Sequence, residues 1–195
     1  QWYKDGIAIP GAVSSTFSAT QAGTYTADII SGGCTGKSTN SSVIAVTPLP
    51  SGSITPASAN VCAGNTVLLT VTGGTSYQWY KDGILITGAT TSTYSASQTG
   101  TYTADIISGA CKVNASNNAI IKVLPLPSGS INPASATLCT GATIVLTATG
   151  GTSYQWYKDG VAISGATAAT YNATTSGKYS ADIINGTCKN KATND

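Results

Sequence analysis

Short runs of alternating apolar and polar residues follow one another along this chain, and they predict β-strands rather than helices. Within the stretch 65–72, the side chains of Val67, Leu69 and Val71 fall on one face of the expected strand. No segment has a helical period of useful length. Further strands are predicted at 76–81, 84–86, 93–96, 100–107 and 119–124.

The strand pattern recurs because the chain consists of repeated units. The hexapeptide QWYKDG begins at Gln1, Gln78 and Gln155, which gives a period of 77 residues (78 − 1 and 155 − 78). Pro-Leu-Pro segments follow Val46 and Val123 and mark stiff seams between units. We predict three units: 1–50, a partial unit that lacks its first strands; 51–127, a complete unit; and 128–195, a unit that lacks its last strand. The missing strands are expected in chain outside this sequence.

The composition excludes two classes of partner. Only 8% of the residues are charged, and the net charge of +2 comes from nine Lys and seven Asp that are scattered singly. Without a basic cluster, nucleic acid is not expected as a partner. No apolar stretch approaches the roughly 18 residues of a membrane span, so none is expected. Polarity carried by Ser, Thr, Asn and Gly in short strands is typical of an extracellular all-β protein.

The five cysteines fall into two series of the same period, Cys34, Cys111 and Cys188 on one hand and Cys62 and Cys139 on the other. The simplest pairing places one bridge in each unit, Cys62–Cys111 and Cys139–Cys188. The partner of Cys34 would then lie outside the sequence. Zinc is the alternative, but the chain has no CxxC motif and no histidine.

Three motifs resemble the core of the immunoglobulin fold: LTV from Leu69, the tryptophan Trp79, and GTYTA from Gly100. The resemblance implies tandem β-sandwiches of about seven strands each. The sequence departs from the antibody pattern, because Val71 and Ala104 stand where antibody domains have the two cysteines of the core disulfide. The expected core aromatic residues are Trp2, Trp79, Trp156, Tyr25, Tyr102 and Tyr179.

A longer pattern covers the whole chain: C-x-G…L…YQW-x-x-x-G…I-x-G-A-T…TY…G-x-Y…G-x-C. It resembles the immunoglobulin-like repeats of large cell-surface adhesins and other secreted proteins of Bacteroidota, including the giant adhesins of gliding motility. The resemblance implies export through the type IX pathway and a place in a stalk, filament or adhesive array at the cell surface. The main partners would be further copies of the repeat in the same chain.

Catalysis is not expected, because the chain has no His, Glu or Arg to serve as base or acid for a Ser or Cys nucleophile. Asp82 belongs to a tight Asp-Gly turn, and Asp105 alternates outward beside Ala104, near Gln78 if Trp79 lies opposite Ala104. Calcium would need more oxygen donors than these carboxylates offer. We therefore expect no catalytic residue, no cofactor and no metal.

Two features are candidates for binding. Tyr3, Tyr80 and Tyr157 should face out of the sheet, where a tyrosine can stack on a sugar ring. An ordinary cross-strand contact with Thr103 or its equivalents is the favoured explanation of these tyrosines. The hairpins around the cysteines Cys34, Cys111 and Cys188 vary most between units and would be the place for a ligand, unless they have merely drifted.

Three functions remain open from the sequence. The first is a spacer or stalk of a secreted or cell-surface protein. The second is an adhesin repeat that binds surface glycans, proteins or neighbouring filament chains. The third is an accessory module of a secreted enzyme. The near-identity of the units favours the stalk, because a binding module would be expected to diversify one set of loops.

Overall fold

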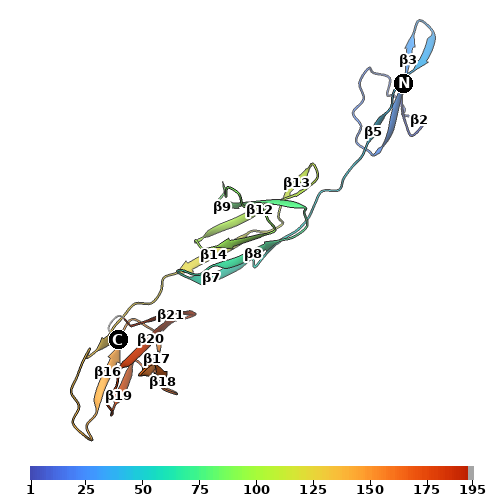
Figure 1. Cartoon of the computed structure of the whole chain (residues 1–195). Coiled ribbons are helices and arrows are strands. Elements are labelled where there is room, and N and C mark those ends of the chain that lie inside the picture. Colours follow the sequence, from blue (N-terminus) through green and yellow to red (C-terminus); the bar gives the residue numbers. More distant parts are fainter. Residues whose placement is uncertain (193–195) are drawn as a thin grey trace. The chain divides into compact units, whose positions relative to one another are not determined.

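The computed structural model describes residues 1–192, and all of their regular elements are β-strands (Figure 1). The chain divides into two compact units, Gln1–Leu49 and Pro50–Asp195. Strand pairing within the second unit stays inside two groups, at 54–124 and at 131–191. The repeat boundaries predicted at 51–127 and 128–195 remain a prediction, and positions 193–195 of the last repeat lie outside the described residues.

The group at 54–124 is an immunoglobulin-like sandwich of two sheets. One sheet has the strand order β10-β9-β12-β14-β7, with β13 also paired to β12, and the other has the order β11-β8-β6. The strands are β6 (Ile54–Thr55), β7 (Ser58–Cys62), β8 (Val67–Val71), β9 (Ser76–Lys81), β10 (Ile84–Leu85), β11 (Thr93–Ala96), β12 (Gly100–Ser108), β13 (Cys111–Asn114) and β14 (Ala119–Leu124).

The core of this sandwich follows the alternation of the sequence. On β8, Leu69 is fully buried, whereas its neighbour Leu68 is 56% exposed. Trp79 on β9 is also fully buried, and its indole Nε1 donates a hydrogen bond of 2.9 Å to the carbonyl of Thr91. Ala104 lies opposite Trp79, so the condition for placing Asp105 beside Gln78 is met. The all-β immunoglobulin-like fold predicted from the sequence is therefore confirmed.

A strand that the sequence did not predict closes one edge of the larger sheet. β7 pairs in parallel with β14, and Cys62 lies opposite Leu124 at the end of both strands. The stretch Ser58–Cys62 is short, and it lies about sixty residues from its partner in the sequence, so nothing local indicates the pairing. It places Cys62, the last residue of β7, at the same end of the sandwich as the linker to the next repeat.

The group at 131–191 repeats this arrangement without a counterpart of β7 or β14 among its described residues. Its sheets have the orders β15-β16-β19 and β18-β17-β20-β21. Trp156 is fully buried, as Trp79 is. The strands are β15 (Ile131–Asn132), β16 (Ile144–Ala148), β17 (Ser153–Lys158), β18 (Val161–Ala162), β19 (Thr170–Ala173), β20 (Tyr179–Asn185) and β21 (Cys188–Lys191).

The first unit has a single sheet, with the order β2-β1-β3-β4 and with β5 also paired to β3. Tyr25 is buried here, but Trp2 is half-buried, because no second sheet covers it among residues 1–49. The ring of Phe17 lies 6.0 Å from that of Trp2 and covers part of it. The strands are β1 (Trp2–Lys4), β2 (Ile7–Ala8), β3 (Gly23–Ser31), β4 (Cys34–Lys37) and β5 (Ser42–Ile44).

The QWYKDG motif ends in the hairpin turn that the sequence predicts. Asp82 and Gly83 have φ angles of 51° and 78°, in the left-handed region that a two-residue hairpin requires. The Asp82 carboxylate accepts a hydrogen bond of 2.8 Å from the backbone N–H of Thr101, so this side chain also ties the turn to β12. Its role is structural.

The two faces of β8 can be tested with adjacent leucines. Replacing the fully buried Leu69 by alanine should lower the free energy of unfolding of this sandwich by about 2–5 kcal/mol, because it leaves a cavity between the sheets. Leu68→Ala, on the exposed face of the same strand, should change it by less than about 0.5 kcal/mol. Urea unfolding of the full chain, followed by tryptophan fluorescence, measures both. Equal losses would contradict the assignment of the faces.

Candidate functional site

The strand directions place Cys62 and Cys111 at opposite ends of the complete sandwich. β14 runs antiparallel to β12, with Ile121 opposite the first residue of β12, and Cys62 lies beside Leu124, still further beyond that end. Cys111 pairs with Ser108 at the other end of β12. About eleven residues of extended strand separate the two positions, which is roughly 35 Å. A disulfide needs Cα atoms within about 7 Å, so the predicted Cys62–Cys111 bridge does not fit this fold.

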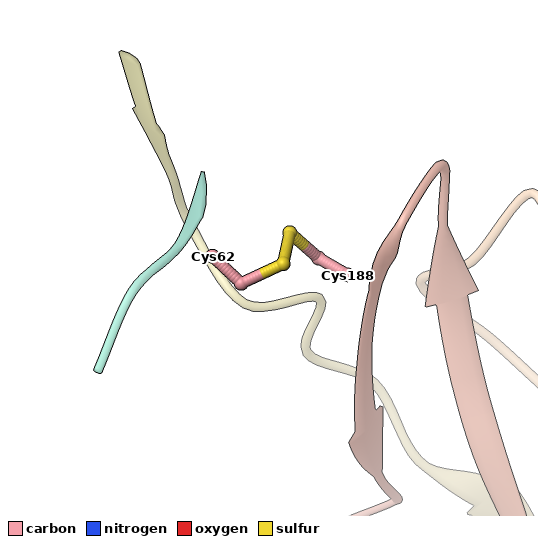
Figure 2. Close-up of a disulfide and its surroundings, with 2 residues drawn as sticks. All are labelled: Cys62 and Cys188. Atoms are coloured by element: carbon pink, nitrogen blue, oxygen red, sulfur yellow. A yellow bond between two sulfur atoms is a disulfide. The ribbon is translucent and has the colours of Figure 1, made fainter. Parts of the chain in front are cut away.

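Cys62 is bonded instead to Cys188, in the hairpin between β20 and β21 of the following sandwich (Figure 2). The S–S distance is 2.02 Å and the Cα atoms are 5.5 Å apart. Neither Cys62–Cys111 nor Cys139–Cys188 is therefore present, and the sequence-based pairing is wrong. The bond does not close one repeat but joins two consecutive repeats.

Burial differs among the three hairpin cysteines in a way that follows from this bond. Cys188 is 1% exposed, whereas Cys111 is half-buried and Cys34 is exposed, although all three occupy the same position of the repeat. The hairpin of Cys188 also contacts the linker, because Asn190 Nδ2 donates a hydrogen bond of 3.2 Å to the carbonyl of Pro127. Pro127 is itself buried. The hairpin, the linker and Cys62 therefore form one junction.

The signal for this pairing was present in the sequence. The turn between β7 and β8 and the hairpin between β12 and β13 lie at opposite ends of the complete sandwich. The end of one repeat meets the beginning of the next. A cysteine before β8, such as Cys62, therefore lies close to the cysteine hairpin of the following repeat. The repeat period allows this longer pairing as readily as the shorter one. Cys139, which occupies the same repeat position as Cys62, has an exposed thiol.

The second candidate site is the face of the sheet that carries the QWYKDG tyrosines. Tyr80 is half-buried, and its hydroxyl donates a hydrogen bond of 2.7 Å to Asp105. Asp105 is 5% exposed and forms an ion pair with Lys112 of β13. The carboxylate thus points out of the sheet as predicted, but the tyrosine and the lysine cover it. A buried charge is tolerated here because both partners satisfy it.

The same pair recurs in the other repeats. Tyr157 donates to Asp182 at 2.9 Å, and Tyr3 donates to Asp28 at 2.7 Å. Lys189 lies 3.3 Å from Asp182, which is 7% exposed. Each tyrosine hydroxyl therefore donates its hydrogen bond within the sheet and cannot donate the same hydrogen bond to a sugar. Stacking of a glycan on these rings stays a prediction.

The electrostatics of this face follow from the hydrogen bonds. The pKa of Tyr80 is raised, first because its hydroxyl donates a hydrogen bond to the carboxylate of Asp105 and then because burial disfavours the charged phenolate. In the turn, Lys81 lowers the pKa of Asp82 through their hydrogen bond of 2.8 Å. Residues 1–192 contain no group of three His, Cys, Asp or Glu that could hold a metal ion.

The described part of the chain has no helix that could cross a membrane. It also brings no nucleophile and base together at the two features above. What the arrangement offers chemically is a covalent link between two repeats and, in each repeat, an aspartate that accepts a hydrogen bond from a tyrosine of the same sheet.

Residues 50–125 match the family model described as Ig-like domain CHU_C associated. This stretch covers the complete sandwich from β6 to β14 and is an Ig-like domain. The match is consistent with the resemblance to Bacteroidota-type repeats. No curated protein matches the chain.

Several solved structures of immunoglobulin-domain proteins are similar to the chain. The N-terminal eight Ig domains of Down Syndrome Cell Adhesion Molecule isoform 1.30.30 are 19% identical, over 98% of this chain and 35% of that one, with a TM-score of 0.37. A structure described as the basis of Dscam isoform specificity is 18% identical, over 87% of this chain and 52% of that one, with a TM-score of 0.32. The chain thus spans about half or less of these proteins, and similarity at this level carries no argument about binding.

A peptide map should show the junction directly. Digestion of the unreduced protein in the presence of a thiol-blocking reagent should release a cross-linked pair of peptides that contain Cys62 and Cys188, and reduction should separate it. The reagent should label Cys34 and Cys139, whose thiols are exposed. A peptide pair that joins Cys62 to Cys111 would contradict the fold, because it needs both cysteines at one end of the sandwich.

The tyrosine–aspartate pair predicts a local titration. Because the folded-state pKa of Tyr80 is raised, this contact stabilises the fold below the ordinary tyrosine pKa of about 10, and the contribution is lost as the pH rises through the raised value. NMR of ¹³Cζ-labelled tyrosine, with Tyr80→Phe to assign the signal, measures the midpoint. Asp105→Asn should move it back down towards the ordinary value. An unchanged midpoint would show that the carboxylate does not hold the phenol.

Proposed function

We propose that this chain is a non-enzymatic structural segment of a secreted or cell-surface protein, a stalk of immunoglobulin-like repeats joined covalently from one repeat to the next. The observation that carries the proposal is the Cys62–Cys188 disulfide. A bridge inside one repeat would stabilise that repeat alone, whereas this bridge fixes the junction between two. Disulfides persist in oxidising compartments, which fits an extracellular protein.

The connectivity has a mechanical consequence. Tension along the chain enters Cys62, crosses the disulfide and leaves at Cys188, so the 126-residue separation between them is bypassed. The strands from β8 to β20, with the tryptophan cores of both sandwiches, lie in this bypassed segment. Pulling on the ends therefore does not extend these strands while the disulfide is intact. That property suits a stalk that must resist unfolding under load.

The same link can recur along a longer array. Cys62 and Cys139 occupy one repeat position, and the hairpin cysteines occupy the other, so the pairing found here continues if Cys139 bonds to the hairpin of a following repeat. Export through the type IX pathway and a place in a Bacteroidota surface or gliding filament are the specific form of this proposal. They rest on the sequence resemblance and on the family match of residues 50–125.

The two other functions have less support. The hairpin of Cys188 is part of the junction, because it bonds to Cys62 and contacts Pro127, so this hairpin is used between repeats. The tyrosine face has its hydroxyls bound to aspartates. A glycan- or protein-binding role would then depend on the hairpins of the other repeats. No contact in the described residues favours an accessory module of an enzyme.

Single-molecule force spectroscopy tests the load path. When the oxidised chain is pulled from its ends, unfolding should release less length than in the reduced chain. The difference should be roughly 430 Å, since 126 residues each contribute about 3.4 Å of extended chain. Cys188→Ala should behave like the reduced protein even without reductant.

Cys139→Ala is the matched control, because Cys139 occupies the position of Cys62 in the next repeat and is not bonded to another cysteine here. Its oxidised form should keep the short extension. If the oxidised parent protein releases the same length as Cys188→Ala, the disulfide does not carry the load and the mechanical proposal fails.

A further inference from the structure

The smaller sheet of the sandwich at 131–191 ends on a strand whose outer edge has no partner. The strand order of this sheet is β15-β16-β19, and within residues 1–192 no strand pairs with the far side of β19. The smaller sheet of the complete sandwich ends in the same way, on β11. The open edge is therefore a feature of the repeat, because the repeat that has all its strands shows it too.

The register of β19 identifies the backbone groups on that edge. β16 and β19 are antiparallel, and the N–H of Ala148 donates a hydrogen bond of 2.7 Å to the carbonyl of Ala169. In an antiparallel pair, hydrogen-bonded positions alternate with positions whose N–H and C=O point away from the partner strand. Thr170 and Asn172 therefore direct their N–H and C=O groups to the open edge.

A hollow of about 380 Å³ lies beside this edge. It is lined by the segment 163–168 on one side and by Thr170, Tyr171 and Asn172 on the other. Exposed edge strands are usually protected by charged residues or by proline against pairing with another chain. Residues 160–177 contain neither a charged residue nor a proline. An added strand therefore meets no barrier of that kind at this edge.

One side chain distinguishes β19 from its counterpart β11. In the complete sandwich, the hydroxyl of Thr91 donates a hydrogen bond of 2.8 Å to the carbonyl of Thr93, which lies on the open edge of β11. Adding the period of 77 converts Thr91 to Ala168 and Thr93 to Thr170. Because alanine has no hydroxyl, the carbonyl of Thr170 lacks this cap. The edge of β11 is thus partly occupied from within, whereas the edge of β19 is available.

A second copy of the same edge supplies the matching groups. Two antiparallel copies of β19 can lie about a two-fold axis with Thr170 of each copy opposite Asn172 of the other. Both residues direct their N–H and C=O outward, so each such pair can exchange two hydrogen bonds. The side chains placed opposite one another, threonine and asparagine, are polar and uncharged. The edge is therefore complementary to itself.

We propose that β19 is a contact site between two copies of this chain, which pair edge to edge and extend the smaller sheet across both molecules. The strand of each copy fills the hollow beside the strand of the other. Because β19 has four residues, one such contact is weak, and it gains strength where several repeats of two chains engage together. The contact uses no residue of the disulfide junction, so this pairing and the proposed load path can fail separately.

Sedimentation velocity of the full oxidised chain over a range of concentrations measures the pairing, with the exposed thiols of Cys34 and Cys139 alkylated beforehand. A reversible dimer is expected. Amide hydrogen exchange, measured by NMR, should slow at Thr170 and Asn172 as the concentration rises. A chain that remains monomeric up to about 1 mM would overturn the proposal. A dimer whose protected amides lie elsewhere, such as 135–139, would do the same.

Two reciprocal substitutions exchange the cap between the repeats. Ala168→Thr should weaken dimer formation at least about fivefold, because it offers the carbonyl of Thr170 the intramolecular hydrogen bond that Thr93 accepts. Thr91→Ala should leave the β19 contact intact and add concentration-dependent protection at Thr93 and Ser95. Dimers of equal strength in the parent and in Ala168→Thr would contradict the assigned edge.

Asn172→Pro tests the backbone of the edge directly. Proline removes one outward N–H at a position where an edge strand tolerates it, so the chain should keep its thermal unfolding midpoint and lose the dimer. A folded Asn172→Pro chain that dimerises as the parent does would overturn the proposal. If this variant does not fold, Ala168→Thr decides the same question, because it changes only an exposed side chain beside the strand.

Discussion

A row of three packed aromatic rings holds each sandwich together. In the complete repeat, the ring of Trp79 lies 5.9 Å from that of Tyr94, which lies 5.7 Å from that of Tyr102. The row crosses from the larger sheet to the smaller one and back, so it joins the two sheets through the core. Trp156, Tyr171 and Tyr179 repeat it with nearly the same spacings. Aromatic pairs at such distances contribute beyond the area that they bury.

The direction of the strands around this core sets where the rest of the chemistry lies. Because β7 and β14 end side by side, Cys62 lies at the end where the chain leaves the sandwich. The hairpin that carries Cys188 lies where the chain has just entered the next one, as its contact with Pro127 shows. One bond between these positions therefore joins neighbours and takes most of both sandwiches out of the path of a pulling force. The proposed role as a stalk rests on this topology.

The outer face of the larger sheet holds a buried carboxylate whose charge is balanced by neighbouring side chains. Asp105 is buried on that face, but Tyr80 and Lys112 complete its hydrogen bonding. Chains of such satisfied contacts rigidify a sheet without making it reactive.

Local pattern was sufficient to predict much of the fold. The alternation of apolar residues placed β9, β11 and β14 at their observed bounds, and the Asp82-Gly83 dipeptide identified the turn. The repeat period also showed that Trp79 and Trp156 have equivalent positions, and both are fully buried. These features depend on residues that are close in sequence or on one face of one strand, so a single sequence carries them.

The tertiary structure decided the features that depend on distant pairing. β7 forms because β14 lies beside it, and that pairing then fixes the end of the sandwich at which Cys62 lies. The period alone allowed Cys62 to pair within its repeat or with the next. The strand directions exclude the first pairing, because they place Cys62 and Cys111 roughly 35 Å apart. In the same way, Asp105 alternates outward in the sequence, but in the fold it is buried and accepts a hydrogen bond from the Tyr80 hydroxyl. The sequence by itself determined the strands, the turn and the equivalent positions of the repeats. The tertiary structure decided which distant residues are in contact, because such contacts exist only in the folded chain.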